Sequence, residues 1–146
     1  MNTLVICPGC KAKNRIPRDK QHLAPKCGRC GISLVGAPVS GIVNPLTDAK
    51  FQQVEQSPLL VLVDFYSPTC GPCRMIAPVI ENLAGLYAGR LLVYKLDTTS
   101  QRMSSARFQI RGVPTLLFFK EGAMVDQLVG AVPQADIERR INTLLD

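Results

Sequence analysis

Six cysteines form three C-x-x-C pairs, and this spacing suits three different kinds of chemistry. The pairs are Cys7/Cys10, Cys27/Cys30 and Cys70/Cys73. A C-x-x-C pair binds zinc, closes a redox disulfide, or only packs as two small apolar side chains. The spacing between the pairs, and the elements that carry them, must decide which pair does what.

The first two pairs match the pattern of a structural zinc site. C-P-G-C and C-G-R-C are separated by residues 11–26, within the middle spacing of about 15–20 residues typical of such sites. Each short gap favours a tight turn that presents two sulfurs, and two turns complete a closed tetrahedral site. We therefore expect one structural zinc per chain, bound by Cys7, Cys10, Cys27 and Cys30. Two unrelated pairs, or disulfides, are the alternative.

The net charge of +6 lies entirely in the first part of the chain. Residues 1–40 contain seven basic residues against one acidic residue, Asp19, whereas residues 41–146 contain equal numbers of both. We expect these cations to stabilise a negatively charged zinc–thiolate cluster or simply to face solvent. They are also compatible with a nucleic-acid interface. Residues 1–40 contain no Phe, Tyr or Trp on which bases stack, so we expect no nucleic-acid partner.

The charge boundary also predicts two domains. Segment 35–41 is small, uncharged and contains Pro and Gly, as in a linker or the approach to a strand. We expect a zinc-binding module at 1–36 and a larger domain at 37–146. The hydrophobic content of 47% suffices for a core in that larger domain. No apolar run approaches the roughly 20 residues of a membrane helix, so we expect no membrane partner.

The larger domain alternates strand-like and helix-like segments, which is typical of the α/β class. Continuous apolar runs predict strands at 59–66 and 91–97, and a hairpin joins 115–120 to 124–130 around Glu121-Gly122. Helices are expected at about 48–56 with Thr47 as N-cap, at about 71–87, near 101–108 and at 134–145.

The third pair lies where strand 59–66 ends and helix 71–87 begins. The free N–H groups and the dipole at a helix N-terminus favour an anion, so they should lower the pKa of Cys70. Cys73 falls one turn into the helix, on the side that faces the core. Since the other four cysteines complete a zinc site by themselves, redox chemistry is favoured over metal binding for this pair.

Several segments together resemble the thioredoxin family in sequence and order. They are VLVDFYSPTCGPCRMIAPVIENLA, YKLD, IRGVPTLLFFKEG and VGAVPQADIERRI. The basic extension with four cysteines resembles the thioredoxin 2 subgroup of bacteria. The resemblance implies a thioredoxin fold, a central mixed β-sheet flanked by helices, preceded by a small zinc-ribbon-like module. It also implies a thiol–disulfide oxidoreductase that reduces protein disulfides. Its electrons would come from NADPH through thioredoxin reductase, without a bound organic cofactor.

The same resemblance assigns roles to individual residues. Cys70 matches the attacking nucleophile and Cys73 the resolving thiol. Asp64 matches a buried acid that accepts the proton of Cys73, although a purely structural carboxyl satisfied by hydrogen bonds is the alternative. Lys95 matches a lysine near that acid, and Pro114 a cis-proline.

A substrate groove is also implied beside the two cysteines, lined by Thr69, Gly71, Pro72, Val113, Gly130 and Ala131. The family usually has Trp directly before C-G-P-C, but this chain has Thr69 there and contains no Trp. Redox chemistry does not require that Trp, whereas docking of protein partners makes use of such a surface.

Two other functions are compatible with the sequence. One is a disulfide oxidase or isomerase of an oxidising compartment. The other is a zinc-ribbon binding or adaptor protein on a thioredoxin-like scaffold. The first residues show no charged segment followed by a long apolar run, so we expect a protein of the reducing cytoplasm.

Overall fold

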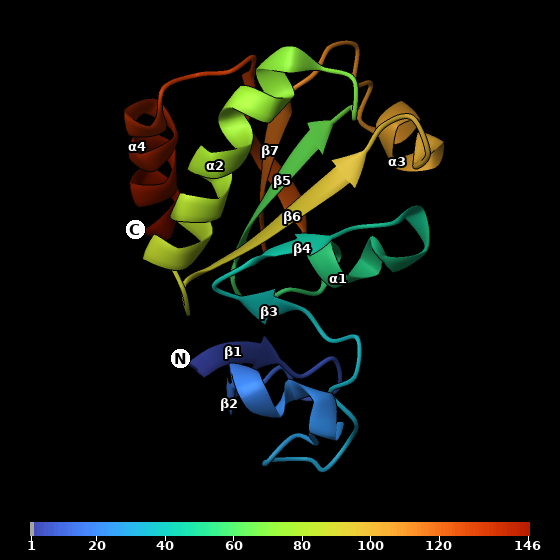
Figure 1. The fold of residues 1–146 in the computed structure, drawn as a ribbon, viewed down its shortest axis with the longest axis vertical. Coiled ribbons are helices and arrows are strands. Elements are labelled where there is room, and N and C mark those ends of the chain that lie inside the picture. Colours follow the sequence, from blue (N-terminus) through green and yellow to red (C-terminus); the bar gives the residue numbers. More distant parts are fainter. Residues whose placement is uncertain (1) are drawn as a thin grey trace.

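The larger domain is built around a five-stranded mixed sheet (Figure 1). The computed structural model describes residues 2–146, apart from the side chains of Asn2, Arg18 and Gln21. The strand order is β4-β6-β5-β7-β8. Strands β4, β6 and β5 are parallel to one another, β7 is antiparallel to β5, and β8 is antiparallel to β7. The strands span Val43–Pro45 (β4), Leu60–Tyr66 (β5), Leu91–Asp97 (β6), Thr115–Lys120 (β7) and Ala123–Val129 (β8). The expected central mixed sheet is confirmed.

Helices cover both faces of this sheet (Figure 1). On one face lie α2 (Gly71–Leu86) and α4 (Gln134–Leu145), and on the other lie α1 (Gln52–Glu55) and α3 (Arg102–Arg107). Successive residues of a strand point to opposite faces, so Leu62 packs on the α2/α4 side while Val61 and Val63 pack on the α1/α3 side. In the described chain, no helix combines the length and apolar character needed to cross a membrane.

The segment near 48–56 is not the single helix that the sequence predicts. A 3₁₀ helix covers Asp48–Lys50, and α1 adds only one α-helical turn after it. Thr47 stands at the start of the 3₁₀ helix, but its side chain makes no capping hydrogen bond. The N–H of Asp48 instead donates to the side-chain oxygen of Gln101 at 2.8 Å. A contact with a distant segment therefore replaces the local cap.

The N-terminal module has its own small sheet and core. Its strand order is β2-β1-β3, formed by Lys13–Pro17 (β2), Asn2–Ile6 (β1) and Val39–Ser40 (β3), and a 3₁₀ helix covers Arg18–Leu23. The buried side chains of its core are Val5, Cys7, Ile16, Cys27 and Leu34. Two of these five side chains are cysteines of the expected metal site, so binding of a metal there would also hold the core together.

The module packs on the larger domain at the end of the sheet opposite the N-terminus of α2 (Figure 1). Ile6 of β1 joins the core on the α1/α3 side of the central sheet. The hydroxyl of Ser40 donates to the carbonyl of Leu91 at 2.7 Å and accepts the N–H of Gly89 at 2.8 Å. The part of the expected linker that forms β3 is therefore ordered and connects the two sheets.

Candidate functional site

Cys70 and Cys73 lie at the junction of β5 and α2, as the sequence predicts, and they form a disulfide. Cys70 is the N-cap residue of α2, and its Sγ accepts the backbone N–H of Cys73 at 3.1 Å. Cys70 is half-buried whereas Cys73 is buried. Because the unpaired N–H groups of the first turn stabilise a thiolate, the more accessible sulfur is also the one placed for ionisation.

The Val113–Pro114 bond next to this pair is cis. Its position is set by the end of the β7–β8 hairpin, because the N–H of Gly130 donates to the carbonyl of Pro114 at 2.8 Å. The carbonyl oxygen of Val113 lies 3.7 Å from Sγ of Cys70. Two chain segments far apart in sequence therefore meet at the half-buried sulfur.

The remaining residues of the expected groove surround Cys70 less closely. Thr69, Gly71 and Pro72 are exposed in the loop and first turn around Cys70, and Ala131 is exposed after Gly130. The structure thus brings the expected groove residues to one end of the sheet, and backbone atoms provide the contacts nearest to the disulfide. Backbone N–H and C=O groups are suited to bind an extended peptide segment regardless of its sequence.

Asp64 lies on β5 with only 5% of its surface exposed. It stands between Lys95 of β6 and Leu116 of β7 in the sheet register. Its Oδ1 has no hydrogen-bond partner among the described residues. Burial raises the pKa of Asp64 to about 7, and the positive charge of Lys95 opposes this only in part. A carboxyl with this pKa exchanges protons near neutral pH.

Two cavities meet at Asp64. One, of about 250 Å³, is lined by both Asp64 and Cys73 together with Lys95 and Arg74. The other, of about 390 Å³, is lined by Asp64, Lys95 and Glu81 among others. Both cavities are open to solvent, so the buried carboxyl has a route for protons in addition to its proximity to Cys73.

Sequence reasoning missed Ser67, which organises the loop before the nucleophile. The Ser67 hydroxyl accepts the N–H of Thr69 at 3.4 Å and lies 3.2 Å from the Thr69 hydroxyl. Its carbonyl accepts the N–H of Cys70 at 3.2 Å. The signal was present, because Ser before a Pro-Thr pair is typical of a side-chain-stabilised turn.

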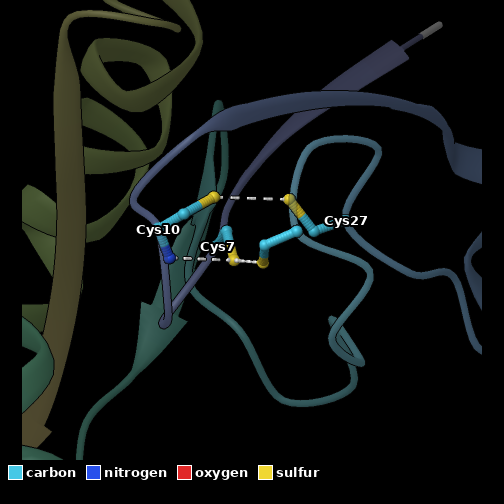
Figure 2. A group of neighbouring side chains, drawn as sticks. Cys7, Cys10 and Cys27 are labelled. Atoms are coloured by element: carbon cyan, nitrogen blue, oxygen red, sulfur yellow. Dashed lines mark hydrogen bonds between the residues drawn. The ribbon is translucent and has the colours of Figure 1, made fainter.

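The other four cysteines gather in the N-terminal module (Figure 2). Sγ of Cys7 lies 3.5 Å from Sγ of Cys30, and Sγ of Cys10 lies 3.6 Å from Sγ of Cys27. All four sulfurs lie within 4.8 Å of one another. A tetrahedral zinc site with Zn–S bonds of about 2.3 Å has sulfur–sulfur distances of about 3.8 Å. The arrangement therefore fits one zinc ion.

Each half of this cluster is a turn of the same construction. The N–H of Lys11 donates to the carbonyl of Cys7 at 3.0 Å, and in the second turn the N–H of Gly31 donates to Cys27 at 2.9 Å. Lys11 and Gly31 both have positive φ angles, 63° and 83°. These turns direct backbone N–H groups at the sulfurs, among them that of Cys10, which donates to Sγ of Cys7 at 3.4 Å (Figure 2).

Asn14 supports the cysteine cluster, a role that the sequence did not reveal. Its side-chain amide nitrogen lies 3.5 Å from Sγ of Cys27 as a donor, and its oxygen accepts the N–H of Gly28 at 2.9 Å. The N–H of Cys30, with those of Arg29 and the Asn14 amide, lowers the pKa of Cys27 to about 5 although burial opposes this. Such donors favour the thiolate that a metal requires.

Comparisons with known proteins identify a family for each of the two parts of the chain. Residues 42–143 match the family model described as Thioredoxin, and residues 6–32 match the model described as Thioredoxin 2, N-terminal, a zinc ribbon. A thioredoxin of Porphyra purpurea is 44% identical over 101 residues, which cover 68% of this chain and 94% of the relative. Thioredoxin 1 of Synechococcus elongatus is 43% identical over 102 residues, 69% of this chain and 95% of the relative.

The comparison with solved structures gives the same result for the fold. A crystal structure of Malassezia sympodialis thioredoxin superposes with a TM-score of 0.67 at 33% identity. The match covers 73% of this chain and 93% of that protein. The sequence resemblance and the expected fold class, including the zinc-ribbon-like module, are thereby confirmed.

Proposed function

This chain belongs to the thioredoxin family of thiol–disulfide oxidoreductases, and we propose that it reduces disulfides of other proteins through Cys70 and Cys73. One observation carries the proposal. A half-buried sulfur at a helix N-terminus stands beside a buried sulfur that shares a cavity with a carboxyl of pKa about 7. This gives one thiol for attack, one for resolution and one base for the proton between them.

In the proposed mechanism, the Cys70 thiolate attacks one sulfur of a substrate disulfide. The other substrate sulfur leaves as a thiolate and takes a proton from solvent. Asp64 accepts the proton of Cys73, and the Cys73 thiolate then attacks Sγ of Cys70. This step releases the second substrate thiolate and closes the Cys70–Cys73 disulfide. Two electrons pass from the dithiol to the substrate.

The surrounding groups are assigned supporting roles in this proposal. Lys95 stabilises the charged form of Asp64, since its positive charge opposes the rise in the Asp64 pKa. Val113, Pro114, Gly130 and Ala131 line one wall of the substrate groove, and Thr69, Gly71 and Pro72 line the other. Carbonyl and N–H groups of this groove hold the substrate backbone while the two sulfurs exchange.

The redox partners and location are part of the same proposal. The oxidised form is returned to the dithiol by thioredoxin reductase with electrons from NADPH, and the protein works in the cytoplasm on disulfide-containing proteins. The decisive assay is insulin reduction with NADPH and thioredoxin reductase. Turnover that requires both cysteines supports the proposal. Absence of reduction would favour the adaptor function. Net oxidation of a reduced protein would favour the oxidase function.

The roles of the two cysteines can be tested separately. Cys73→Ser should accumulate mixed disulfides through Cys70, because resolution is blocked, whereas Cys70→Ser should accumulate essentially none. Non-reducing gels of each variant with an oxidised protein substrate provide the measurement. Equal accumulation by both variants would contradict the assignment of nucleophile and resolving thiol.

We also propose that residues 1–36 form a zinc module and residues 37–146 the thioredoxin domain. Cys7, Cys10, Cys27 and Cys30 would hold one zinc ion, which supplies a closed structural cross-link and no open position for substrate. Elemental analysis of the purified chain should give one zinc per chain, and the Cys70→Ser/Cys73→Ser variant should retain it.

A further inference from the structure

The N-terminal module presents a strongly cationic surface with a single acidic side chain, that of Asp19. Its exposed cations are Lys11, Lys13, Arg15, Lys20, Lys26 and Arg29. Among the side chains that the structure describes, none of these forms an ion pair, since all three ion pairs lie in the larger domain. A zinc ion with four thiolates carries a formal charge of about −2. The module therefore keeps an excess of positive charge even with its metal bound.

Three aliphatic side chains of the module are exposed, Leu23, Ile32 and Val35, and Leu23 and Val35 are the most exposed of them. Leu23 is 63% exposed at the end of the 3₁₀ helix, and Val35 is 70% exposed in the turn after Leu34. Lys26 pairs with Ser33, and the N–H of Leu34 donates to the carbonyl of Pro25 at 2.9 Å.

This antiparallel contact brings the segment that follows Leu23 beside the segment that precedes Val35. Lys20 lies one turn before Leu23 in the 3₁₀ helix, and Lys26 lies on the strand-like segment between the two. Two exposed aliphatic side chains and two exposed cations are thus carried by two adjoining segments of the module, which we call the Leu23/Val35 patch (Lys20, Leu23, Lys26 and Val35).

We propose that the Leu23/Val35 patch is a docking surface for an acidic protein segment that also carries aliphatic side chains. Carboxylates complement the unpaired cations, and aliphatic groups cover the exposed Leu and Val. A nucleic acid would complement the positive charge of the patch but not its aliphatic side chains. Residues 1–40 offer no aromatic side chain for base stacking, and aliphatic side chains gain little against a phosphate backbone.

The patch is separate from the redox site. The module lies at the end of the sheet opposite the N-terminus of α2, where Cys70 begins the helix (Figure 1). A partner bound at the module therefore leaves the groove beside Cys70 open. Docking there would retain an acidic protein near the enzyme without taking part in disulfide exchange.

Binding of defined probes to the full-length, zinc-loaded protein tests this proposal directly. The probe is a short fluorescent peptide of Glu and Leu, measured by anisotropy against two matched peptides, one with Gln in place of Glu and one with Ser in place of Leu. We expect the Glu/Leu peptide to bind best and its affinity to fall as salt rises. Lys20→Glu/Lys26→Glu should weaken binding about tenfold or more, and Leu23→Ser/Val35→Ser about fivefold.

A charge-matched control separates the patch from net charge. Lys50→Glu/Arg102→Glu makes the same change in exposed cations of the thioredoxin domain and should leave peptide affinity within about twofold. Insulin reduction should stay unchanged in all three variants, which also separates this proposal from that of the redox function.

Three outcomes would overturn the inference. Equal weakening by the control variant would mean that only net charge matters. Tighter binding of a short DNA duplex than of the peptide, insensitive to the Leu23/Val35 change, would identify a nucleic-acid surface. Binding only to vesicles of anionic lipid would identify a membrane surface.

Discussion

The carboxyl of Asp64 lies in the central strand with an unpaired oxygen and a pKa near 7, while an ordinary aspartate titrates near 4. The folded state binds this proton more tightly than the unfolded state does. Stability contributed by the neutral carboxyl is therefore present in full below about pH 4 and is lost as the pH rises to about 7. Above that range, the charged, buried carboxylate costs up to about 4 kcal/mol.

Asp64→Asn should remove this cost. We expect the variant to be more stable than the wild type at pH 8 by a few kcal/mol, with little difference at pH 4. Its turnover near neutral pH should fall because Cys73 loses its proton acceptor. Urea unfolding at both pH values, together with insulin reduction, measures the two effects. A variant that is less stable and fully active would leave only a structural role for Asp64.

Thr69 distinguishes the surface around the nucleophile from that of the family, which usually carries Trp at this position. Its side chain is exposed and contacts only the Ser67 hydroxyl among the hydrogen bonds of this loop. Thr69→Trp adds a broad apolar surface and should raise kcat/KM toward protein disulfides several-fold, equivalent to about 1 kcal/mol. A small aromatic disulfide hardly contacts that surface and should react at an unchanged rate.

Thr69→Ala is the matched control for Thr69→Trp. It removes the same hydroxyl contact without adding apolar surface, so it should not raise turnover of protein disulfides. If the Trp variant accelerates both substrates alike, position 69 acts through the thiol pKa or the potential and not through docking.

At the scale of elements, the two zinc turns provide an internal comparison. Both require a positive φ angle at the residue that follows the second cysteine, and glycine meets this requirement only in the second turn, at Gly31. A Cβ added at Gly31 would meet no atom within 4 Å. Any cost of Gly31→Ala must therefore come from the backbone conformation and not from a clash.

We expect Gly31→Ala to weaken the module by about 1 kcal/mol, the usual cost of a left-handed conformation for a residue with a Cβ. Since folding and metal binding are coupled, zinc affinity should fall about fivefold. Competition with a chromophoric chelator measures it. Gly28→Ala lies in the same turn without a positive φ angle and is the control. An equal loss in both variants would contradict the conformational argument.

The elements that the sequence predicted well are those with a strong local signal. Continuous apolar runs located β5, β6 and β7, and the stripe at Ile137 and Ile141 located α4. The short strands β1 to β4 were not predicted, because two to five residues carry little periodicity and their pairing depends on distant segments. The single helix expected near 48–56 is instead a 3₁₀ turn and one α-helical turn, and its first N–H is bound by the distant Gln101 and not by Thr47.

The cluster of Cys7, Cys10, Cys27 and Cys30 and the pairing of Cys70 with Cys73 could be predicted because the spacing of the cysteines is itself a signal. The turn signal at Ser67 was present and was missed, whereas the role of Asn14 could not be predicted, since a single polar residue near a cysteine acquires its role only when the chain folds around it. The same holds for the cavities at Asp64, which are lined by residues of several elements.

At the scale of the whole molecule, the module and the thioredoxin domain share a boundary but depend on different forces. The central sheet buries two large apolar clusters, one on each face. The module buries few side chains, and two of them are cysteines of the proposed zinc site. Contacts of Ile6, Ser40 and Asn44 connect the two parts. Ile6 packs in the core of the central sheet, and the Ser40 hydroxyl donates to the carbonyl of Leu91. The Asn44 amide donates to the carbonyls of Val39 at 2.8 Å and Val93 at 3.0 Å.

Removal of zinc should therefore unfold the module and leave the thioredoxin domain folded. Without metal, four thiolates would face one another in a core too small to hold them together. Amides of β1 and β2 should lose protection from hydrogen exchange after chelation, whereas those of β5, β6 and β7 should keep it. The loss of Ile6 from the shared core should lower the Tm of the domain by only a few degrees.

The Cys70→Ser/Cys73→Ser variant is the control for chelation, because it has no other thiols that the treatment can affect. It should bind one zinc and show the same loss of protection confined to the module. If chelation exposes the β5 amides as well, the two parts form a single cooperative unit, and the zinc ion then stabilises the fold that carries the redox site. If zinc is absent from this variant, the metal belongs to the C-G-P-C pair, and the assignment of Cys7, Cys10, Cys27 and Cys30 is wrong.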